Sequence, residues 1–316
     1  NFGFSVDIQG DTIVVGAPLF DVSASLIDAG IAYVYRRINS TDWQRTRTLA
    51  TPTPTTSGAF GASVSIDGNT IVIGAPKELN KGIAHVFVCD TAFSQCPSEA
   101  ALTAADGANN DLFGNAVAID GDRVAVGAPF NAAGGSLRGA VYIFERTTSV
   151  WSQAQKLVAS NAGDSDWFGS SVALDGDVLV AGAPNEDSGD VNNPADNSKP
   201  QSGAAYVFTR ETAGWSESQY LKAPIILQGL VFGFSVAIDN GNLVISAPYL
   251  SSPTESGLVY VFAQTSTSWI STGGLFHINQ PNAFGRSVDI DGDTIVVGEP
   301  LEDTNGDDSG AVNVFE

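Results

Sequence analysis

The chain has 316 residues, of which 43% are hydrophobic, so it is long and apolar enough to bury a sizeable core. It carries 14 lysines and arginines against 35 aspartates and glutamates, a formal net charge of −21. This balance argues against nucleic-acid binding, which needs clustered basic residues to contact phosphates. No stretch approaches the roughly 18 consecutive apolar residues of a membrane span, so we expect none in this chain.

A module of fixed length recurs six times. Each copy opens with a Phe-Gly step and reaches a Gly-Ala-Pro-like corner fourteen residues later. The copies open at Phe2, Phe60, Phe113, Phe168, Phe232 and Phe284, and their corners begin at Gly16, Gly74, Gly127, Gly182, Ser246 and Gly298. Successive copies start 52 to 64 residues apart. A constant module inside a variable repeat predicts one supersecondary unit joined by loops of different length.

The first half of each module is predicted to be a β-hairpin. In the sixth copy, residues 287–290 alternate polar with apolar side chains, and residues 294–297 form a run that is apolar on both faces. Between them, Asp291-Gly292 supplies the positive φ angles that a two-residue turn needs. The same turn is predicted at Asp67, Asp120 and Asp175, so these aspartates are interpreted as hairpin formers and not as metal ligands.

Two further strands complete the repeat. A third strand follows each corner, starting at Gly30, Gly82, Gly139, Gly203, Gly257 and Gly310. A fourth is marked by a tryptophan with a leucine six residues later, at residues 43–49, 151–157, 215–221 and 269–275. Four antiparallel strands form a propeller blade, and blades stack because one sheet cannot cover its own apolar faces. Phenylalanine and tryptophan side chains are expected to fill the gaps between blades.

We therefore predict an all-β fold, a six-bladed β-propeller of four-stranded antiparallel blades that forms a single domain over residues 1–316. The last blade lacks its fourth strand within this chain, which begins at its first strand without an initiator methionine or a signal-peptide pattern. An incomplete blade exposes unpaired backbone groups at its edge. A trimmed closing strand, a seventh repeat outside this chain, and a strand donated by another subunit all remain open.

The Phe-Gly starts and the Gly-Ala-Pro corners at 16–18, 74–76, 127–129 and 182–184 resemble those of FG-GAP repeat propellers, the architecture of the integrin alpha-subunit head. The resemblance implies an extracellular or cell-surface, non-catalytic adhesion module that binds proteins or glycans. Integrin propellers hold calcium in a loop of about nine residues between the first two strands. Only four residues separate Ile66 from Ile71 here, so that metal site is not transferred.

Carboxylates gather in the loops that follow the corners and precede the Phe-Gly steps, including Asp106, Asp111, Asp164 and Asp166. These loops should emerge on one face and make it acidic. Three interpretations stay open: a solvated surface, a docking surface for a basic partner, and a weak Ca²⁺ site. The Ca²⁺ candidates are Asp303, Asn305, Asp307 and Asp308, whose oxygens can converge around a glycine.

The longest connection runs from Asn185 to Ser202 and has no apolar periodicity. Long loops in compact domains are usually functional or mobile, so its acidic residues Glu186, Asp187 and Asp190 are the first candidates for partner contact. The alternative is an ordinary surface excursion without a role.

The only cysteines, Cys89 and Cys96, replace the tryptophan-marked hairpin of the second blade. A disulfide is the simplest interpretation and indicates an oxidising compartment, while two buried thiols or a metal site need more assumptions. Asn39 opens an N-glycosylation sequon, Asn39-Ser40-Thr41.

Catalysis finds little support in the sequence. One of the two histidines, His85, stands where other copies have tyrosine, so it is interpreted as a structural substitute. No Ser/His/Asp arrangement can be traced. We expect no enzyme activity, with adhesion as the leading function. The alternatives are a subunit of an extracellular filament and a hydrolase or lyase that acts on polysaccharide.

Overall fold

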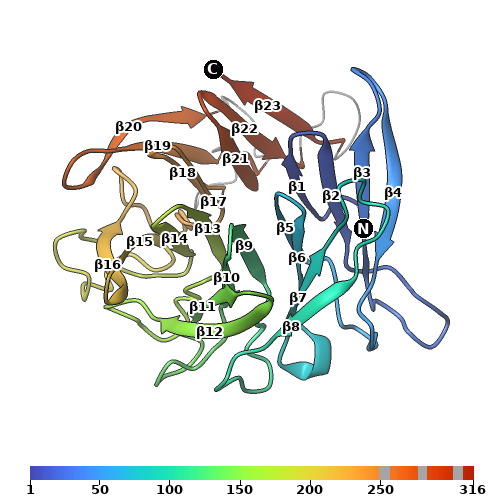
Figure 1. Ribbon diagram of the computed structural model, residues 1–316. Coiled ribbons are helices and arrows are strands. Elements are labelled where there is room, and N and C mark those ends of the chain that lie inside the picture. The colour runs from blue at the N-terminus through green and yellow to red at the C-terminus, as the bar shows by residue number, and fades with distance from the viewer. Residues whose placement is uncertain (249–256, 277–282, 302–308) are drawn as a thin grey trace. The chain divides into compact units, whose positions relative to one another are not determined.

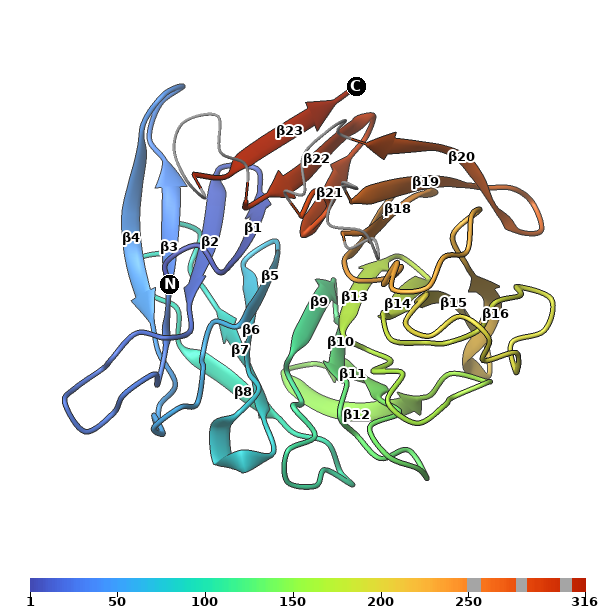
Figure 2. The same cartoon turned by 180° about the vertical axis from the view of Figure 1, so that it is seen from behind.

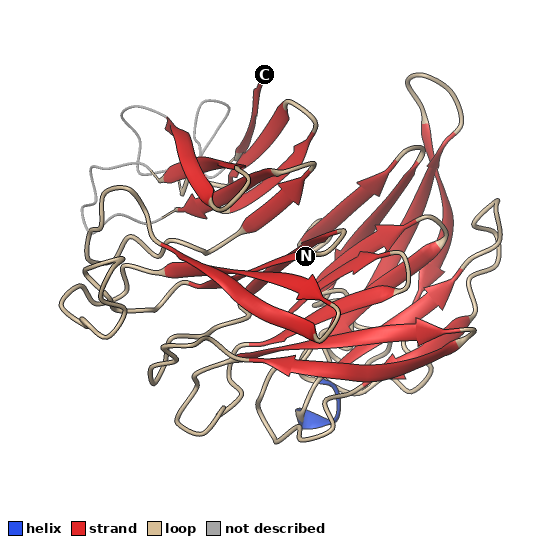
Figure 3. Ribbon diagram, turned by 60° about the vertical axis from the view of Figure 1, so that its left-hand side comes forward, coloured by secondary structure: helices blue, strands red, loops and turns tan. Residues whose placement is uncertain are grey.

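The computed structural model describes residues 1–248, 257–276, 283–301 and 309–316. Strands dominate these residues, and the helix they contain is a short 3-10 turn, η1 (Glu78–Asn80) (Figure 3). The strands form six antiparallel sheets that follow one another along the chain, five of four strands and the last of three. The predicted six-bladed β-propeller is confirmed, including the three-stranded last blade.

The blades have these bounds. Blade 1 comprises β1 (Ser5–Gln9), β2 (Thr12–Ala17), β3 (Ile31–Arg37) and β4 (Trp43–Leu49). Blade 2 comprises β5 (Ser63–Asp67), β6 (Thr70–Ala75), β7 (Ile83–Val88) and β8 (Ser98–Leu102). Blade 3 comprises β9 (Ala116–Asp120), β10 (Arg123–Ala128), β11 (Ala140–Thr147) and β12 (Val150–Leu157). Blade 4 comprises β13 (Ser171–Asp175), β14 (Val178–Ala183), β15 (Ala204–Glu211) and β16 (Gly214–Leu221). Blade 5 comprises β17 (Val236–Asp239), β18 (Asn242–Ala247), β19 (Leu258–Gln264) and β20 (Trp269–Phe276). Blade 6 comprises β21 (Ser287–Asp291), β22 (Thr294–Glu299) and β23 (Ala311–Phe315).

The blades divide into two compact units. The first unit, residues 1–133 and 140–157, contains blades 1 to 3, and the second, residues 134–139 and 158–316, contains blades 4 to 6. Figures 1 and 2 show the blades of each unit from opposite sides. Within each blade the sheet order is the chain order, as Figure 1 shows for β5 to β8.

The first hairpin of each blade follows the predicted turn chemistry. In blade 2, Asp67 pairs with Thr70, and Gly68 between them has a φ of +57°. In blade 5, Asn240 takes the same left-handed conformation with a φ of +46°. Asparagine is the non-glycine residue that tolerates this conformation best. The turn positions were therefore predictable one by one.

The hairpin aspartates also join consecutive blades. Asp67 Oδ2 accepts a hydrogen bond of 2.7 Å from the backbone N–H of Gly121 in blade 3. In the second unit, Asp239 Oδ2 accepts one of 2.7 Å from Gly292 N in blade 6. A carboxylate acceptor strengthens such a bond. Each of these aspartates thus links its blade to the turn of the next blade.

The glycine of the corner contacts the Phe-Gly step of the following blade. A Cβ atom added to Gly74 would lie 2.0 Å from the carbonyl oxygen of Gly114, and one added to Gly182 would lie 1.9 Å from that of Gly233. The Gly114 carbonyl also accepts a 2.9 Å hydrogen bond from Ser63 Oγ. At Gly74 and Gly182 only a hydrogen atom fits at this contact, whereas blade 5 has Ser246 at the equivalent position.

The phenylalanines that open blades 2 to 6 are at most 1% exposed: Phe60, Phe113, Phe168, Phe232 and Phe284. Each packs on aromatic or histidine rings of its own third strand, as Phe113 does on Tyr142 at 5.6 Å. Phe2, which opens blade 1, is 62% exposed and packs on Tyr33 at 5.5 Å.

Cys89 and Cys96 form the predicted disulfide bond. Both sulfur-bearing side chains are buried in the core cluster shared by blades 1 and 2, together with Phe93 from the loop that they close. The guanidinium of Arg36 in blade 1 lies 5.2 Å from the Phe93 ring centre, a cation–π distance. The disulfide loop therefore takes the place of the tryptophan hairpin and packs against blade 1.

Candidate binding site in the fourth blade

The connection between β14 and β15 forms an ordered loop, called here the blade-4 loop (residues 185–202). A backbone hydrogen bond of 2.8 Å joins Gly189 N to Asp196 O. Asp187 closes the loop twice, because its carbonyl accepts from Lys199 N at 3.0 Å and its carboxylate from Gln201 N at 2.8 Å. These contacts hold the loop in one shape.

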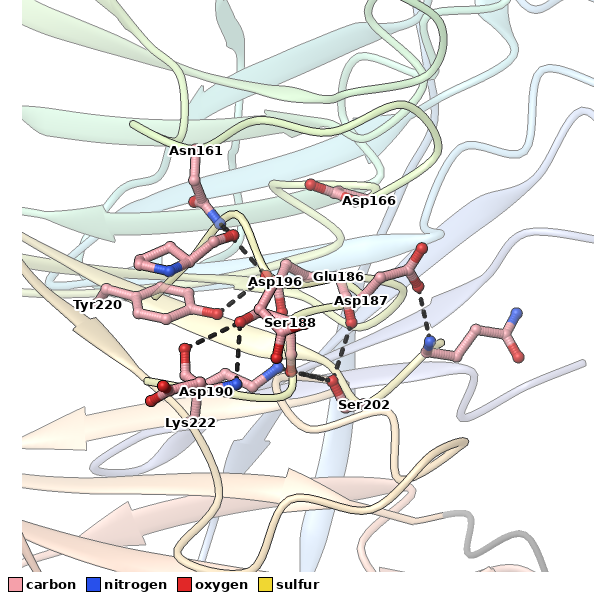
Figure 4. A network of polar contacts seen from close by, with 12 residues as sticks. Asn161, Asp166, Glu186, Asp187, Ser188, Asp190, Asp196, Ser202, Tyr220 and Lys222 are labelled. Atoms are coloured by element: carbon pink, nitrogen blue, oxygen red, sulfur yellow. Dashed lines mark hydrogen bonds and ion pairs between the residues drawn. The ribbon is translucent and has the colours of Figure 1, made fainter. Parts of the chain in front are cut away.

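A buried ion pair lies beneath the blade-4 loop (Figure 4). Lys222 Nζ is 2.6 Å from Glu186 Oε2, and the two side chains are only 1% and 2% exposed. The other carboxylate oxygen of Glu186 accepts from the Tyr220 hydroxyl at 2.9 Å and from the Asn161 amide at 3.2 Å. A buried charge pair is tolerated when further hydrogen bonds support it, as those to both Glu186 oxygens do here.

Two buried serines continue the network into the loop. Lys222 Nζ donates to Ser202 Oγ at 2.7 Å, and Ser202 Oγ donates to the Ser188 carbonyl at 2.9 Å. Ser188 Oγ in turn donates to the Asp190 carbonyl at 2.9 Å. Ser188 and Ser202 are 0% and 1% exposed. The network thus anchors both ends of the blade-4 loop to the blade core, as the dashed lines in Figure 4 show.

Burial shifts the proton affinities of several groups in this region. Burial lowers the pKa of Lys222, and the adjacent Glu186 carboxylate offsets part of this effect. Burial raises the pKa of Tyr220, and Glu186 raises it further, so this hydroxyl remains a donor. Burial also raises the pKa of Asp166 to about 6, against the opposing hydrogen bond from Gly163 N. The titration of Asp166 therefore lies close to neutral pH.

The three predicted partner residues have different environments. Glu186 is buried and engaged in the network, so its carboxylate cannot be presented to a partner. Asp187 is half-buried and Asp190 is exposed. A partner role therefore rests on Asp187 and Asp190, and for them it stays a prediction.

Exposed aliphatic side chains lie beside these aspartates in the chain and in the neighbouring loop. Val191 is 44% exposed. The loop after β16 carries Ile225 and Leu227, which are 64% and 42% exposed. A hydrogen bond of 3.0 Å from Gly229 N to Pro200 O places this second loop next to the blade-4 loop. The two loops together offer acidic and aliphatic groups.

Other predicted loop carboxylates divide into two kinds. Asp111 and Asp166, each two residues before a Phe-Gly step, are 4% and 5% exposed. Each carboxylate accepts a hydrogen bond from the backbone N–H three residues earlier, at 2.9 Å for Asp111 and 2.6 Å for Asp166. These bonds close the turns before the Phe-Gly steps. Asp106 and Asp164 are more than half exposed. The expected acidic surface is therefore reduced by the carboxylates that stabilise loops internally.

The remaining candidates stay predictions. Asn39 is exposed at the β3–β4 turn, where its Oδ1 accepts from the backbone N–H groups of Thr41 and Asp42 at 2.9 Å each. The Ca²⁺ candidates Asp303, Asn305, Asp307 and Asp308 lie outside the described residues. Within the described ranges, no group of three or more His, Cys, Asp or Glu side chains is arranged to hold a metal ion. In the same ranges no helix has the length and hydropathy needed to cross a bilayer.

His85 belongs to the interior of blade 2. It is 2% exposed, and its Nε2 lies 2.8 Å from Glu78 Oε2. Glu78 Oε1 accepts from Thr51 Oγ1 at 2.9 Å. The trio fastens the loop after the corner of blade 2 to the core, which gives His85 the structural role expected for it.

Sequence reasoning missed Lys222, the cation that anchors the blade-4 loop. Its position directly follows the leucine that ends the fourth strand, where other blades have Ala50, Thr103 and Val158. The available signal was a lysine at a position where other blades have small or uncharged residues. It occurs in the same blade whose corner is followed by Glu186.

Comparison with known proteins agrees with these repeats. A family model described as the FG-GAP repeat matches residues 1–35, 43–87, 97–144, 151–208, 215–262 and 279–315. The chain belongs to the FG-GAP repeat family. A search of curated proteins finds no significant match to this FG-GAP chain. Its structure is similar to that of Sqt1 from Saccharomyces cerevisiae, with a TM-score of 0.51 and 10% sequence identity over all of this chain and 82% of that one. A likeness at this identity supports the fold alone.

Proposed function

We propose that this FG-GAP protein is an extracellular or cell-surface adhesion module without enzyme activity, and that it binds a basic protein partner through the blade-4 loop. The observation that carries the proposal is the preorganised loop, fixed from below by the buried Glu186–Lys222 pair. A loop already held in its bound shape loses little conformational entropy on binding.

Charge and chemistry favour a basic protein over an anionic glycan. The chain carries a formal charge of −21, which attracts cationic partners and repels anionic ones. Asp187 and Asp190 supply carboxylates at the loop surface, and Ile225 and Leu227 supply apolar area beside it. The Cys89–Cys96 disulfide supports an oxidising, extracellular location.

Selection of a displayed library of random short peptides on the wild-type protein tests this proposal. Enriched peptides should be rich in Lys or Arg, and the double variant Asp187→Asn/Asp190→Asn should bind them at least about tenfold more weakly. Asparagine keeps both Oδ1 acceptors within the loop, so the change removes charge and spares the fold.

The matched control is Asp177→Asn/Asp293→Asn, which removes the same charge from exposed hairpin positions of the same unit. This control should bind the peptides as the wild type does. The proposed binding surface would be contradicted if no enriched class of peptides is rich in basic residues, or if every such class binds both double variants equally.

Self-assembly is a second candidate, favoured by the sheet of blade 6. Among the described residues this sheet ends at β23, and Val312 and Val314 on that strand are 68% and 60% exposed. An apolar edge strand can accept a further strand from another chain. Sedimentation velocity over a concentration series should then show oligomers that Val312→Lys/Val314→Lys abolishes, whereas a monomer at every concentration would rule this candidate out.

A further inference from the structure

Blade 1 differs from blades 2, 3 and 4 in the residue that stands two positions after the proline of the corner. In blades 2, 3 and 4 this position holds a buried polar residue that is hydrogen-bonded to the blade core: Glu78, Asn131 and Glu186, at most 4% exposed. In blade 1 the position holds Phe20, which is 43% exposed. A large aromatic group is therefore presented where blades 2, 3 and 4 place an internal anchor.

The loop that carries Phe20, residues 18–29 between β2 and β3, is ordered by its own hydrogen bonds. Val22 N donates to Leu26 O at 3.1 Å, and Leu26 N donates to Ser23 O at 3.0 Å, which closes a tight turn at the tip. Asp28 N donates to Asp21 Oδ1 at 2.9 Å and closes the base. The exposed side chains of this loop are therefore held on a defined backbone.

Several hydrogen bonds fix this loop to the first unit. Gly30 N donates to Phe20 O at 3.0 Å, where β3 begins. Ser57 N, in the segment that leads into blade 2, donates to Ile27 O at 2.8 Å. The surface is thus supported from both blades 1 and 2.

Four large apolar side chains of the loop are exposed. Leu19, Phe20, Val22 and Ile27 have exposed fractions of 47%, 43%, 39% and 50%. An isolated antiparallel bridge joins Ser23 and Leu26, and Val22 and Ile27 flank it in the chain. Four large exposed apolar side chains on one loop held by hydrogen bonds offer apolar area for contact with a protein.

The charges around these side chains indicate which partner fits. The loop contains Asp21 and Asp28 and no lysine or arginine. A second copy of this chain would bring the same aspartates and the same net charge of −21 to the contact, which repels. A basic rim on the partner would instead face Asp21 across the edge of the apolar contact.

We propose that the blade-1 loop, residues 18–29, is a second docking surface that takes a different protein with an apolar centre and a basic rim. This surface belongs to the first unit, whereas the blade-4 loop belongs to the second, so the two can be tested separately.

The test selects displayed random peptides on the wild-type protein and compares their binding to Phe20→Ser/Ile27→Ser. We expect a class of peptides that combine aromatic or aliphatic residues with Lys or Arg, and whose affinity falls at least about tenfold in this variant. The same peptides should bind Asp187→Asn/Asp190→Asn at wild-type strength, which separates this surface from the blade-4 loop.

The matched control is Ile38→Ser/Val150→Ser, which removes two apolar side chains that are 60% and 68% exposed elsewhere in the first unit. It should bind as the wild type does, and unchanged melting temperatures should show that both double variants are folded. The proposal would be overturned if every enriched class of peptides bound Phe20→Ser/Ile27→Ser at wild-type strength. So would a wild-type dimer in sedimentation velocity that this variant abolishes, because it would make a second copy the occupant.

Discussion

Replacing Gly74 with alanine tests the contact that couples successive repeats. The new Cβ would lie 2.0 Å from the carbonyl oxygen of Gly114, although Cβ atoms essentially never approach other atoms within 3.0 Å. Gly74 lies in the buried strand β6, and Gly114 opens blade 3, so both partners are backbone groups that cannot rotate away. Blades 2 and 3 must therefore separate by about 1 Å or more to admit one methyl group.

The destabilisation follows from this displacement. Overpacking a core usually costs about 1–3 kcal/mol, and a clash between backbone groups belongs at the upper end of that range. Separation also strains the 2.9 Å hydrogen bond from Ser63 Oγ to Gly114 O. We expect a loss of about 3 kcal/mol in unfolding free energy, which lowers Tm by about 4–5 °C for a chain of this size.

Calorimetry or urea unfolding of Gly74→Ala measures this effect, with Gly273→Ala as the control. Gly273 lies in β20 and has no atom within 4 Å of the added Cβ and no positive φ, so alanine should be neutral there or slightly stabilising. A Gly74→Ala protein that melts within about 1 °C of this control would refute the steric origin of the corner glycine.

Three further outcomes are expected. Lys222→Met should lower the unfolding free energy by about 3–5 kcal/mol because it leaves Glu186 buried without its cation. The double variant Glu186→Gln/Lys222→Met should recover at least half of this loss. Urea unfolding of the two variants measures the recovery, and its absence would contradict this expectation. The pKa of Asp166 is raised from 3.8 to about 6 in the folded state, so its proton stabilises the fold below pH 3.8 and this stabilisation is lost as the pH rises through 6. The unfolding free energy of Asp166→Asn, relative to that of the wild type, should therefore rise by about 2 kcal/mol between pH 4 and pH 7.5. A difference between the two proteins that does not change with pH would disprove the raised pKa. Reduction of the Cys89–Cys96 disulfide should cost about 2 kcal/mol, given the short loop that it closes, and urea midpoints with and without reductant measure it.

The blades were predictable because the sequence signals that form each blade lie close together in the chain. The turn at Asp67-Gly68 needs only its neighbours in the sequence, and six copies of the module confirm one another. The disulfide was predictable for the same reason, since Cys89 and Cys96 interrupt a regular hairpin at short range.

The interior of the candidate site was not predictable in this way. Glu186 was interpreted as a surface carboxylate, but Lys222 and Asn161, both distant in the sequence, surround it in the folded chain. The second role of Asp67, as an acceptor for the backbone of Gly121, also depends on how two blades pack. Neither arrangement has a local pattern, because both come from long-range packing.

Hydrogen–deuterium exchange of the blade-4 loop tests the central claim most directly, that a buried pair holds a recognition loop in one shape. In the wild type, the amides of Gly189, Lys199 and Gln201 should exchange slowly because each donates a hydrogen bond within the loop. In Glu186→Gln/Lys222→Met these amides should exchange at least about tenfold faster, while those of β14 stay protected. Fast exchange of the loop in the wild type, or equal rates in both proteins, would contradict the account.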